Sequence, residues 1–234
     1  MIKDVGMQGD LKMEIQRGST NRRTAVDSDF RFVQRWAQKW PAALSRLHLG
    51  SLRLRREIAS APLVRRGPVE FLRGRRSATP LGGWEVMGPP PSAHAVSGRY
   101  NAAGTVALYL STDEQGVRRE LERAVGDLLA IQRYRVDTDT LRILDATEAG
   151  ISNFLHAVFD HAEGCCIEGR GGPMTYHFSQ NVARIAREAG FDGMLVPGVR
   201  GDSTTLYQNL SLFDCGDRWR AWSLGGMGFR QATF

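Results

Sequence analysis

Strand-like and helix-like segments alternate irregularly along the chain, and this order constrains the fold that it can form. Six short apolar runs predict strands, at residues 69–73, 106–111, 134–136, 141–144, 194–196 and 210–213. Helical patterns lie among them, at about residues 113–131, 151–162 and 180–189. Because the segments do not follow a regular βαβ repeat, a doubly wound parallel sheet is disfavoured. The sequence therefore predicts an α+β domain with a mixed sheet and flanking helices.

Positive charge is concentrated in the first 66 residues. These residues hold 14 Lys and Arg against 6 Asp and Glu, a net charge of +8. The rest of the chain holds 17 against 19, a net charge of −2, which accounts for the overall +6. We therefore expect a basic, partly helical N-terminal extension at residues 1–66 and a nearly neutral domain at residues 67–234. Such an arm is compatible with contact to nucleic acid, an acidic partner or an anionic surface, and also with a solvated helical extension.

Within the extension, a helical pattern follows a polar start. Residues 1–28 are polar, mixed in charge and rich in Gly, Ser and Thr, which predicts poor order. Val33, Trp36 and Trp40 then follow helical spacing, and Pro41 is placed to open a second helix. Because Trp and Leu side chains recur in this segment, we expect it to pack against the rest of the protein.

Several classes of protein and site lack support in the sequence. No window approaches the roughly 18 apolar residues of a membrane span, and the first residues do not resemble a signal peptide. Three cysteines, two of them adjacent, do not make a disulfide framework, so we expect a reducing, cytoplasmic setting. The chain has neither a P-loop motif nor a dinucleotide glycine motif between a strand and a helix. The His, Asp and Cys residues between 156 and 166 lack the spacing of a zinc site, so we expect no metal.

The stretch Gly98-Arg99-Tyr100-Asn101 sets a cation beside an aromatic ring, and Tyr109 and Glu120 follow closely. An Arg beside glycines offers a planar set of donors that matches phosphate oxygens, and tyrosine rings stack on flat bases. A carboxylate near a ribose stabilises the positive charge that develops as an N-glycosidic bond breaks. Together these groups suit a dinucleotide such as NAD. Taken singly, they are equally compatible with a surface ion pair, core tyrosines and a solvated helix face.

The same stretch resembles the RES domain, a family named for an Arg, a Glu and a Ser. The resemblance covers about residues 68–214 and rests on segments that occur in the family's order. These segments are Phe71-Leu72-Arg73, Pro89-Pro90-Pro91, Gly98 to Gly104, Leu108-Tyr109-Leu110-Ser111, the helix with Glu120, Phe178 to Pro197, and Asn209-Leu210-Ser211-Leu212-Phe213.

The resemblance implies a fold similar to diphtheria-type ADP-ribosyltransferases and a toxin that consumes NAD as its substrate, without a further cofactor. By position in the family's motifs, the catalytic residues would be Arg99, Glu120, Tyr109 and Ser203. The NAD-binding residues would be Arg73, Tyr100, Asn101, Gly198 and Asn209. Arg99, alone or together with Arg73, would hold the pyrophosphate. Glu120 would polarise the nicotinamide–ribose bond, so that water or phosphate attacks the ribosyl cation.

The chain departs from the family pattern at two places. Gly198 follows Pro197 at the position where the family normally has its Ser, and Ser203 lies five residues later. We expect Ser203 to supply the displaced hydroxyl, with loss of activity as the alternative. Two bulky arginines also precede Glu120, where the family usually has small residues. The chain is therefore identified as a divergent member.

Two other functions are open at this point. Ser111-Thr112 and Glu120-Leu121-Glu122 superficially resemble elements of arginine-directed ADP-ribosyltransferases, although in those enzymes the elements lie farther apart and on separate strands. A domain without the usual Ser could instead only bind a nucleotide, while the basic arm binds nucleic acid. The resemblance also implies a helix-turn-helix antitoxin as a partner, and it leaves a homo-oligomer open.

Overall fold

The computed structural model describes residues 27–37, 49–121, 128–147, 151–167, 176–198, 207–225 and 228–231. These residues form a mixed sheet with flanking helices, which confirms the predicted α+β class.

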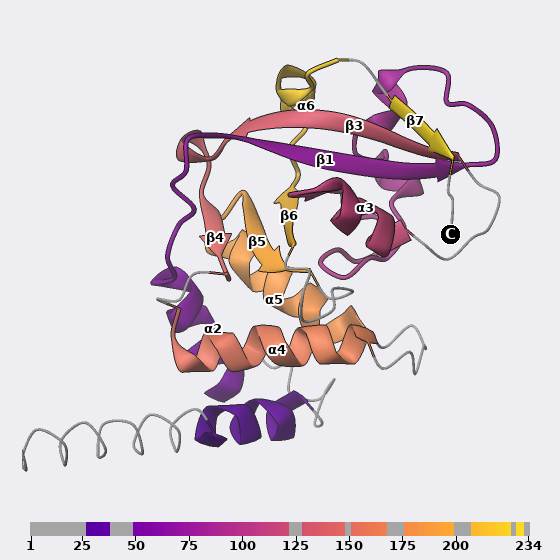
Figure 1. The fold of residues 1–234 in the computed structure, drawn as a ribbon. Helices are drawn as coiled ribbons and strands as arrows, with labels where there is room; N and C mark the ends of the chain where they lie inside the picture. The colour runs from indigo at the N-terminus through magenta and orange to yellow at the C-terminus, as the bar shows by residue number, and fades with distance from the viewer. Residues whose placement is uncertain are drawn as a thin grey trace, which may run out of the picture.

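Seven strands of the described residues form one sheet. They are β1 (Pro68–Ser77), β2 (Ala107–Ser111), β3 (Leu128–Asp137), β4 (Ile143–Asp145), β5 (Gly193–Pro197), β6 (Gln208–Phe213) and β7 (Gly228–Gln231). Their order across the sheet is β4-β5-β6-β2-β1-β3-β7, with β4 and β5 parallel and the other neighbouring pairs antiparallel. Figure 1 shows the long β1–β3 pair running crosswise to β4, β5 and β6.

The helices pack against different parts of this sheet. The helices are α2 (Leu49–Ala59), α3 (Glu114–Leu121), α4 (Asn153–Ile167), α5 (His177–Glu188) and α6 (Arg218–Trp222), and residues 27–37 are also helical. In Figure 1, α5 lies next to β5 and β6, and α4 lies on the far side of α5 from the crosswise strands. Among the described residues, no helix combines the length and apolar character that a membrane crossing requires.

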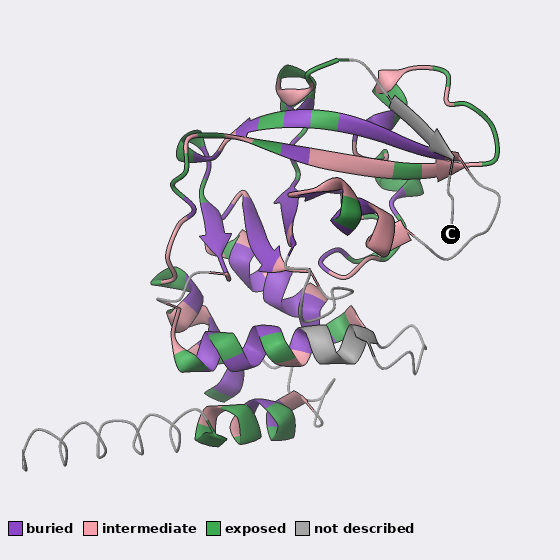
Figure 2. Ribbon diagram, in the orientation of Figure 1, coloured by how far each residue is buried: buried purple, intermediate pink, exposed green. Residues whose placement is uncertain are grey.

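Alternate residues of β5 divide between two cores, because successive side chains of a strand point to opposite faces. Met194 and Val196 pack with the apolar faces of α4 and α5. Leu195 packs instead with Phe71 of β1 and Tyr134 of β3. Figure 2 shows the resulting concentration of buried residues along β4, β5, β6 and α5. The crosswise strands thus close a second core over the opposite face of β5 and β6.

The described parts of the first 66 residues pack against the helical layer. Trp36 is 2% exposed, and its ring lies 5.3 Å from the ring of Phe178 in α5. Arg53 of α2 forms an ion pair of 2.7 Å with Asp29. The helical pattern around Val33 is confirmed by the helix at 27–37. Residues 1–26 and the helix predicted after Pro41 lie outside the described residues, and the division into an extension and a domain stays a prediction.

One predicted helix is too long. The helix that begins after Asp113 ends at Leu121, and residues 128–131 belong to β3. The run Leu128 to Ile131 pairs with β1 on one side and with β7 on the other. A short apolar run is compatible with either helix or strand, so the pairing partners decide its structure. The prediction of a helix to about Ile131 was therefore wrong.

Candidate active site

A cleft of about 330 Å³ lies between α3, the β1–β2–β6 part of the sheet and the loop that carries Arg99. Its volume is that of a small-molecule site. Five residues predicted for the site line it, namely Arg99, Tyr100, Tyr109, Glu120 and Asn209. Apolar walls come from Leu72, Val117, Leu121 and Val196. The fold therefore brings together residues that are up to 110 positions apart in the sequence.

The first turn of α5 holds the backbone of the Arg99 loop. The Ser179 hydroxyl donates to the carbonyl oxygen of Arg99 over 2.5 Å. The Gln180 amide donates to the carbonyl oxygens of Gly98 and Asn101, over 2.8 and 3.0 Å. Because these donors come from a helix packed in the core, the loop is positioned by the body of the protein.

The side chains of Tyr109 and Asn101 form hydrogen bonds that hold the conformation of this loop. The Tyr109 hydroxyl accepts a hydrogen bond from the backbone N–H of Tyr100 and donates to Oδ1 of Asn101, both over 2.8 Å. The Asn101 amide nitrogen donates to the carbonyl oxygens of Val96 and Thr105. The Tyr109 hydroxyl is protonated at neutral pH and can donate, and burial raises its pKa to about 12. Asn101 is directed into its own loop, and it does not line the cleft with Tyr109.

Glu120 presents its carboxylate at the cleft from α3. Its Oε1 atom accepts hydrogen bonds from the Tyr207 hydroxyl over 2.9 Å and from the Asn209 amide over 2.8 Å. Its Oε2 atom lies 3.6 Å from Nη2 of Arg99. The side chains of Arg99 and Glu120 are 12% and 26% exposed, so this ion pair is partly shielded from water. The predicted cation, ring and carboxylate therefore meet in one place.

Arg99 also lies near an aromatic ring. Its guanidinium carbon is 5.8 Å from the centroid of the Tyr100 ring, within the range of cation–π contacts. Tyr100 itself is 1% exposed and packs in the first core, so the core fixes the ring against which the cation lies.

Arg73 does not join this cluster. Along β1, Leu72 and Gly74 line the cleft, whereas the intervening Arg73 points to the opposite face. There its guanidinium lies near Tyr134 and Cys215 and donates to the carbonyl oxygen of Tyr109 over 3.4 Å. Burial lowers its pKa to about 10. The alternation of β1 thus separates Arg73 from the predicted residues that line the cleft, and its contact with the pyrophosphate stays a prediction.

Gly198 lies at the end of β5 and outside the lining of the cleft. Its backbone N–H donates to the carbonyl oxygen of Tyr207 over 2.8 Å. A Cβ atom on Gly198 would lie 2.2 Å from a ring carbon of Tyr207. The ring of Tyr207 therefore occupies the space that a serine side chain would need at this position. Ser203, the predicted substitute, lies outside the described residues.

The sequence profile of the RES domain matches residues 70–222, which is more than half of the chain. The chain belongs to the RES domain family. The match confirms the resemblance that the motifs indicated.

This RES domain was also compared with individual proteins. Among solved structures, it is similar to a chain of the MbcT–MbcA toxin–antitoxin complex of M. tuberculosis, at 18% identity and with a TM-score of 0.47. The similarity covers 76% of this chain and 89% of that chain. The search of curated proteins found no match.

Three further residues contribute to the site of this RES domain without having been predicted to do so. They are Ser179, Gln180 and Tyr207. Tyr207 precedes Asn209 by two positions, and strand periodicity places two such residues on one face, so this signal was present in the sequence. Ser179 and Gln180 act through backbone carbonyls far away in the sequence, and no local pattern predicts such contacts.

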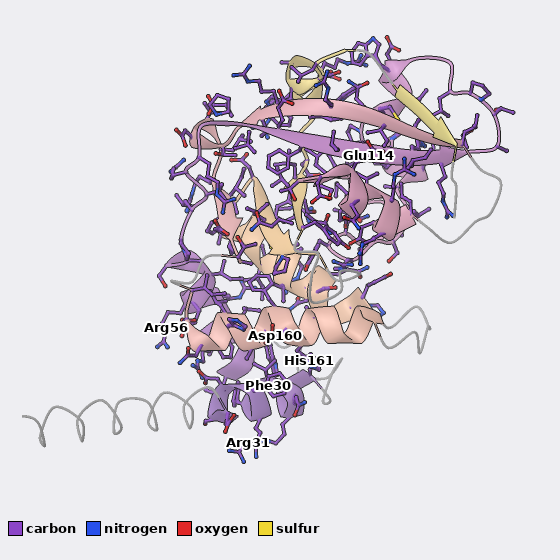
Figure 3. All side chains as sticks on the ribbon, viewed as in Figure 1. Phe30, Arg31, Arg56, Glu114, Asp160 and His161 are labelled. Atoms are coloured by element: carbon purple, nitrogen blue, oxygen red, sulfur yellow. The ribbon has the colours of Figure 1, made fainter. Side chains whose placement is uncertain are left out.

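The His and Asp residues of α4 lie elsewhere. His156 and Asp160 are exposed and 3.1 Å apart, one helical turn from each other. The ring of His161 packs against Phe178 at 5.1 Å, and burial lowers its pKa. Figure 3 shows Asp160 and His161 on α4, far from Glu114 at the start of α3. Among the residues that the structure describes, no group of three His, Cys, Asp or Glu side chains is placed to hold a metal ion.

Proposed function

We propose that this protein is a toxin that targets NAD and cleaves the bond between nicotinamide and ribose. The observation that carries the proposal is the pair of Arg99 and Glu120, 3.6 Å apart in a cleft that is also lined by Tyr100 and Tyr109. A dinucleotide has a pyrophosphate, flat rings and a glycosidic bond that breaks with positive charge. Each of these parts has a matching group in the cleft. Membership of the RES domain family supports the same substrate.

Arg99 would bind the pyrophosphate, because its guanidinium offers paired donors to phosphate oxygens. In this arrangement, the pyrophosphate takes the place of Glu120 as the counter-charge of Arg99. Tyr109 lines the cleft with its ring while its hydroxyl holds the Arg99 loop, so a nicotinamide or adenine ring would lie against a fixed surface.

Glu120 would stabilise the transition state. As the bond between the ribose C1 and the nicotinamide nitrogen breaks, its electron pair leaves with neutral nicotinamide and the ribosyl carbon becomes cationic. A carboxylate beside that carbon lowers the barrier by electrostatic attraction. Water then attacks C1 and loses a proton, which gives ADP-ribose. Attack by phosphate instead gives a phosphorylated ADP-ribose. In both reactions nicotinamide is the second product, and the acceptor bonds to C1 in its place.

A toxin of this kind requires a partner that restrains it. We propose that a helix-turn-helix antitoxin binds this protein, on the strength of its membership of the RES domain family. A homo-oligomer stays an open possibility, and the cytoplasmic location stays a prediction.

The proposal is tested by incubating the purified protein with NAD, with and without phosphate, and measuring nicotinamide release. Replacing Glu120 by Gln keeps the shape of the side chain and removes its charge, so we expect a loss of about 10²–10³-fold in rate. Glu114→Gln is the matched control, because Glu114 lies on the same helix, forms an ion pair with Arg118 and does not line the cleft. Absence of nicotinamide release by the parent protein would contradict the proposal.

The products distinguish hydrolysis of NAD from phosphorolysis and from ADP-ribosylation. Free ADP-ribose indicates hydrolysis, its phosphate indicates phosphorolysis, and modified protein detected by mass spectrometry indicates ADP-ribosylation of a macromolecule. Release by Glu120→Gln at the parent rate would remove Glu120 from the mechanism while leaving the substrate in place.

A further inference from the structure

The ring of Tyr207 lies between two glycines. A Cβ atom on Gly198 would lie 2.2 Å from Cε2 of the ring, and a Cβ atom on Gly116 would lie 2.5 Å from Cδ2. Real Cβ atoms do not approach that closely, so neither position accepts a side chain while the ring stays in place. Tyr207 is 2% exposed. We call Gly116, Tyr207 and Gly198 together the tyrosine slot.

Strand pairing explains one wall of the tyrosine slot. Pro197 and Gln208 are cross-strand partners of β5 and β6, and the next pair is Gly198 with Tyr207, joined through the Gly198 N–H. Side chains of such partners stand on the same face of the sheet, close to each other. The Tyr207 ring can cross its partner because that partner has no side chain.

The other wall of the tyrosine slot belongs to α3. Gly116 lies in the first turn of this helix, where its backbone N–H donates to the Asp113 carboxylate over 2.6 Å. Residues four positions apart lie on the same face of a helix, so the face opened by Gly116 carries Glu120 one turn later. The ring enters beside Gly116 and its hydroxyl reaches the Glu120 carboxylate, 2.9 Å away.

The two carboxylate oxygens of Glu120 have different partners. Tyr207 and Asn209 both donate to Oε1, which leaves Oε2 directed toward Arg99 in the cleft. Hydrogen bonds to a charged acceptor are about twice as strong as those between neutral groups. Because the carboxylate is planar and rigid, hydrogen bonds that fix Oε1 also fix the direction of Oε2.

We infer that Tyr207 is a positioning residue, which fixes the Glu120 carboxylate so that Oε2 faces the substrate in the cleft. The inference rests on the proposed function for its substrate. The two glycines of the tyrosine slot leave space for the ring of Tyr207. Asn209 is the second donor to Oε1 of Glu120.

Kinetics of Tyr207→Phe test the inference, because this change keeps the ring and removes the hydroxyl alone. For NAD cleavage we expect kcat to fall about tenfold to a hundredfold, while KM changes less than about threefold, since the substrate contacts are kept. Tyr134→Phe is the control: it removes a buried hydroxyl that donates to the Met87 carbonyl over 2.8 Å, outside the cleft. A purely structural role would slow both variants alike. An unchanged kcat in Tyr207→Phe overturns the inference.

A second measurement tests the contact between Tyr207 and Glu120 even if the protein does not consume NAD. Tyr207→Phe is made in the parent and in Glu120→Ala, and thermal unfolding of all four proteins is compared. We expect the unfolding midpoint to fall by about 2–4 °C in the parent background, and to stay unchanged in Glu120→Ala, where the acceptor is gone. Equal falls in both backgrounds overturn the inference, whereas absence of NAD consumption with unequal falls overturns only the proposed substrate.

Discussion

Ser179 and Arg99 lie 80 positions apart in the sequence, yet the Ser179 hydroxyl donates to the Arg99 carbonyl oxygen over 2.5 Å. Ser179 is 1% exposed in the first turn of α5. The contact means that the predicted phosphate-binding cation takes its position from a helix of the core. Arg99 is thus part of a preformed site.

Ser179→Ala should weaken the binding of NAD. Loss of this hydroxyl leaves the Arg99 carbonyl without one donor and costs about 1 kcal/mol of stability. Because the Arg99 loop loses a constraint, we expect KM for NAD to rise more than kcat falls. Steady-state kinetics measure both. Ser60→Ala is the control, since Ser60 is exposed, directly follows α2 and donates to carbonyl oxygens of that helix in the contacts described. Equal kinetics for Ser179→Ala and the parent would show that α5 does not position Arg99.

Tyr109 should make stability depend on alkaline pH. Burial raises its pKa from 10 to about 12 in the folded protein. Below pH 10 both the folded and the unfolded chain keep this proton, so the contribution is fully present. Between pH 10 and 12 the unfolded chain releases the proton first, and the contribution is lost as the pH rises through 12.

In Tyr109→Phe this titration is absent. Its free energy of unfolding should therefore fall less between pH 10 and 12 than that of the parent, by about 2 kcal/mol. Urea unfolding at several pH values measures the difference. Tyr134, whose pKa burial also raises to about 12, titrates in both proteins and cancels in the comparison. Parallel curves for parent and variant would contradict the role of burial.

Gly198→Ser should reduce stability and activity, although it introduces the residue that the family normally has there. Its Cβ atom would lie 2.2 Å from the Tyr207 ring, and such overpacking costs typically about 1–3 kcal/mol. Displacement of the ring also removes a donor from Glu120. Gly82→Ser is the control, because nothing lies within 4 Å of a Cβ atom at that exposed position.

The double variant Gly198→Ser with Tyr207→Ala isolates the cause. If the ring is the obstacle, the serine costs less stability once the ring is absent, and the two changes are not additive. Additive losses of unfolding free energy would place the obstacle elsewhere.

Trp36→Ala should destabilise the protein although Trp36 lies outside the residues matched to the RES domain. Its ring packs against Phe154 and Phe178, with centroids 6.5 and 5.3 Å away. Removal of a buried tryptophan costs about 3–5 kcal/mol, which chemical denaturation measures. Phe30→Ala, at a more exposed position of the same helix, is the control and should cost much less. A small loss for Trp36→Ala would show that this segment is dispensable for the core.

Local sequence patterns determined the elements and the identity of the family. Short apolar runs predicted six of the strands, because a short apolar segment between turn signals is typical of a buried strand. Arg99, Tyr109 and Glu120 stand in motifs of contiguous residues, and those motifs sufficed to predict a site for a dinucleotide.

Tertiary structure decided what depends on partners distant in the chain. Pairing with β1 and β7 made residues 128–131 a strand, and the face of β1 separated Arg73 from the cleft. The structure also explains why glycine stands at position 198. The ring of Tyr207 fills the space that a serine side chain would need there, and the Tyr207 hydroxyl donates to Glu120. Hydrogen bonds and steric contacts act between atoms a few ångströms apart. Contacts between residues that meet only after folding therefore cannot be predicted from local sequence patterns.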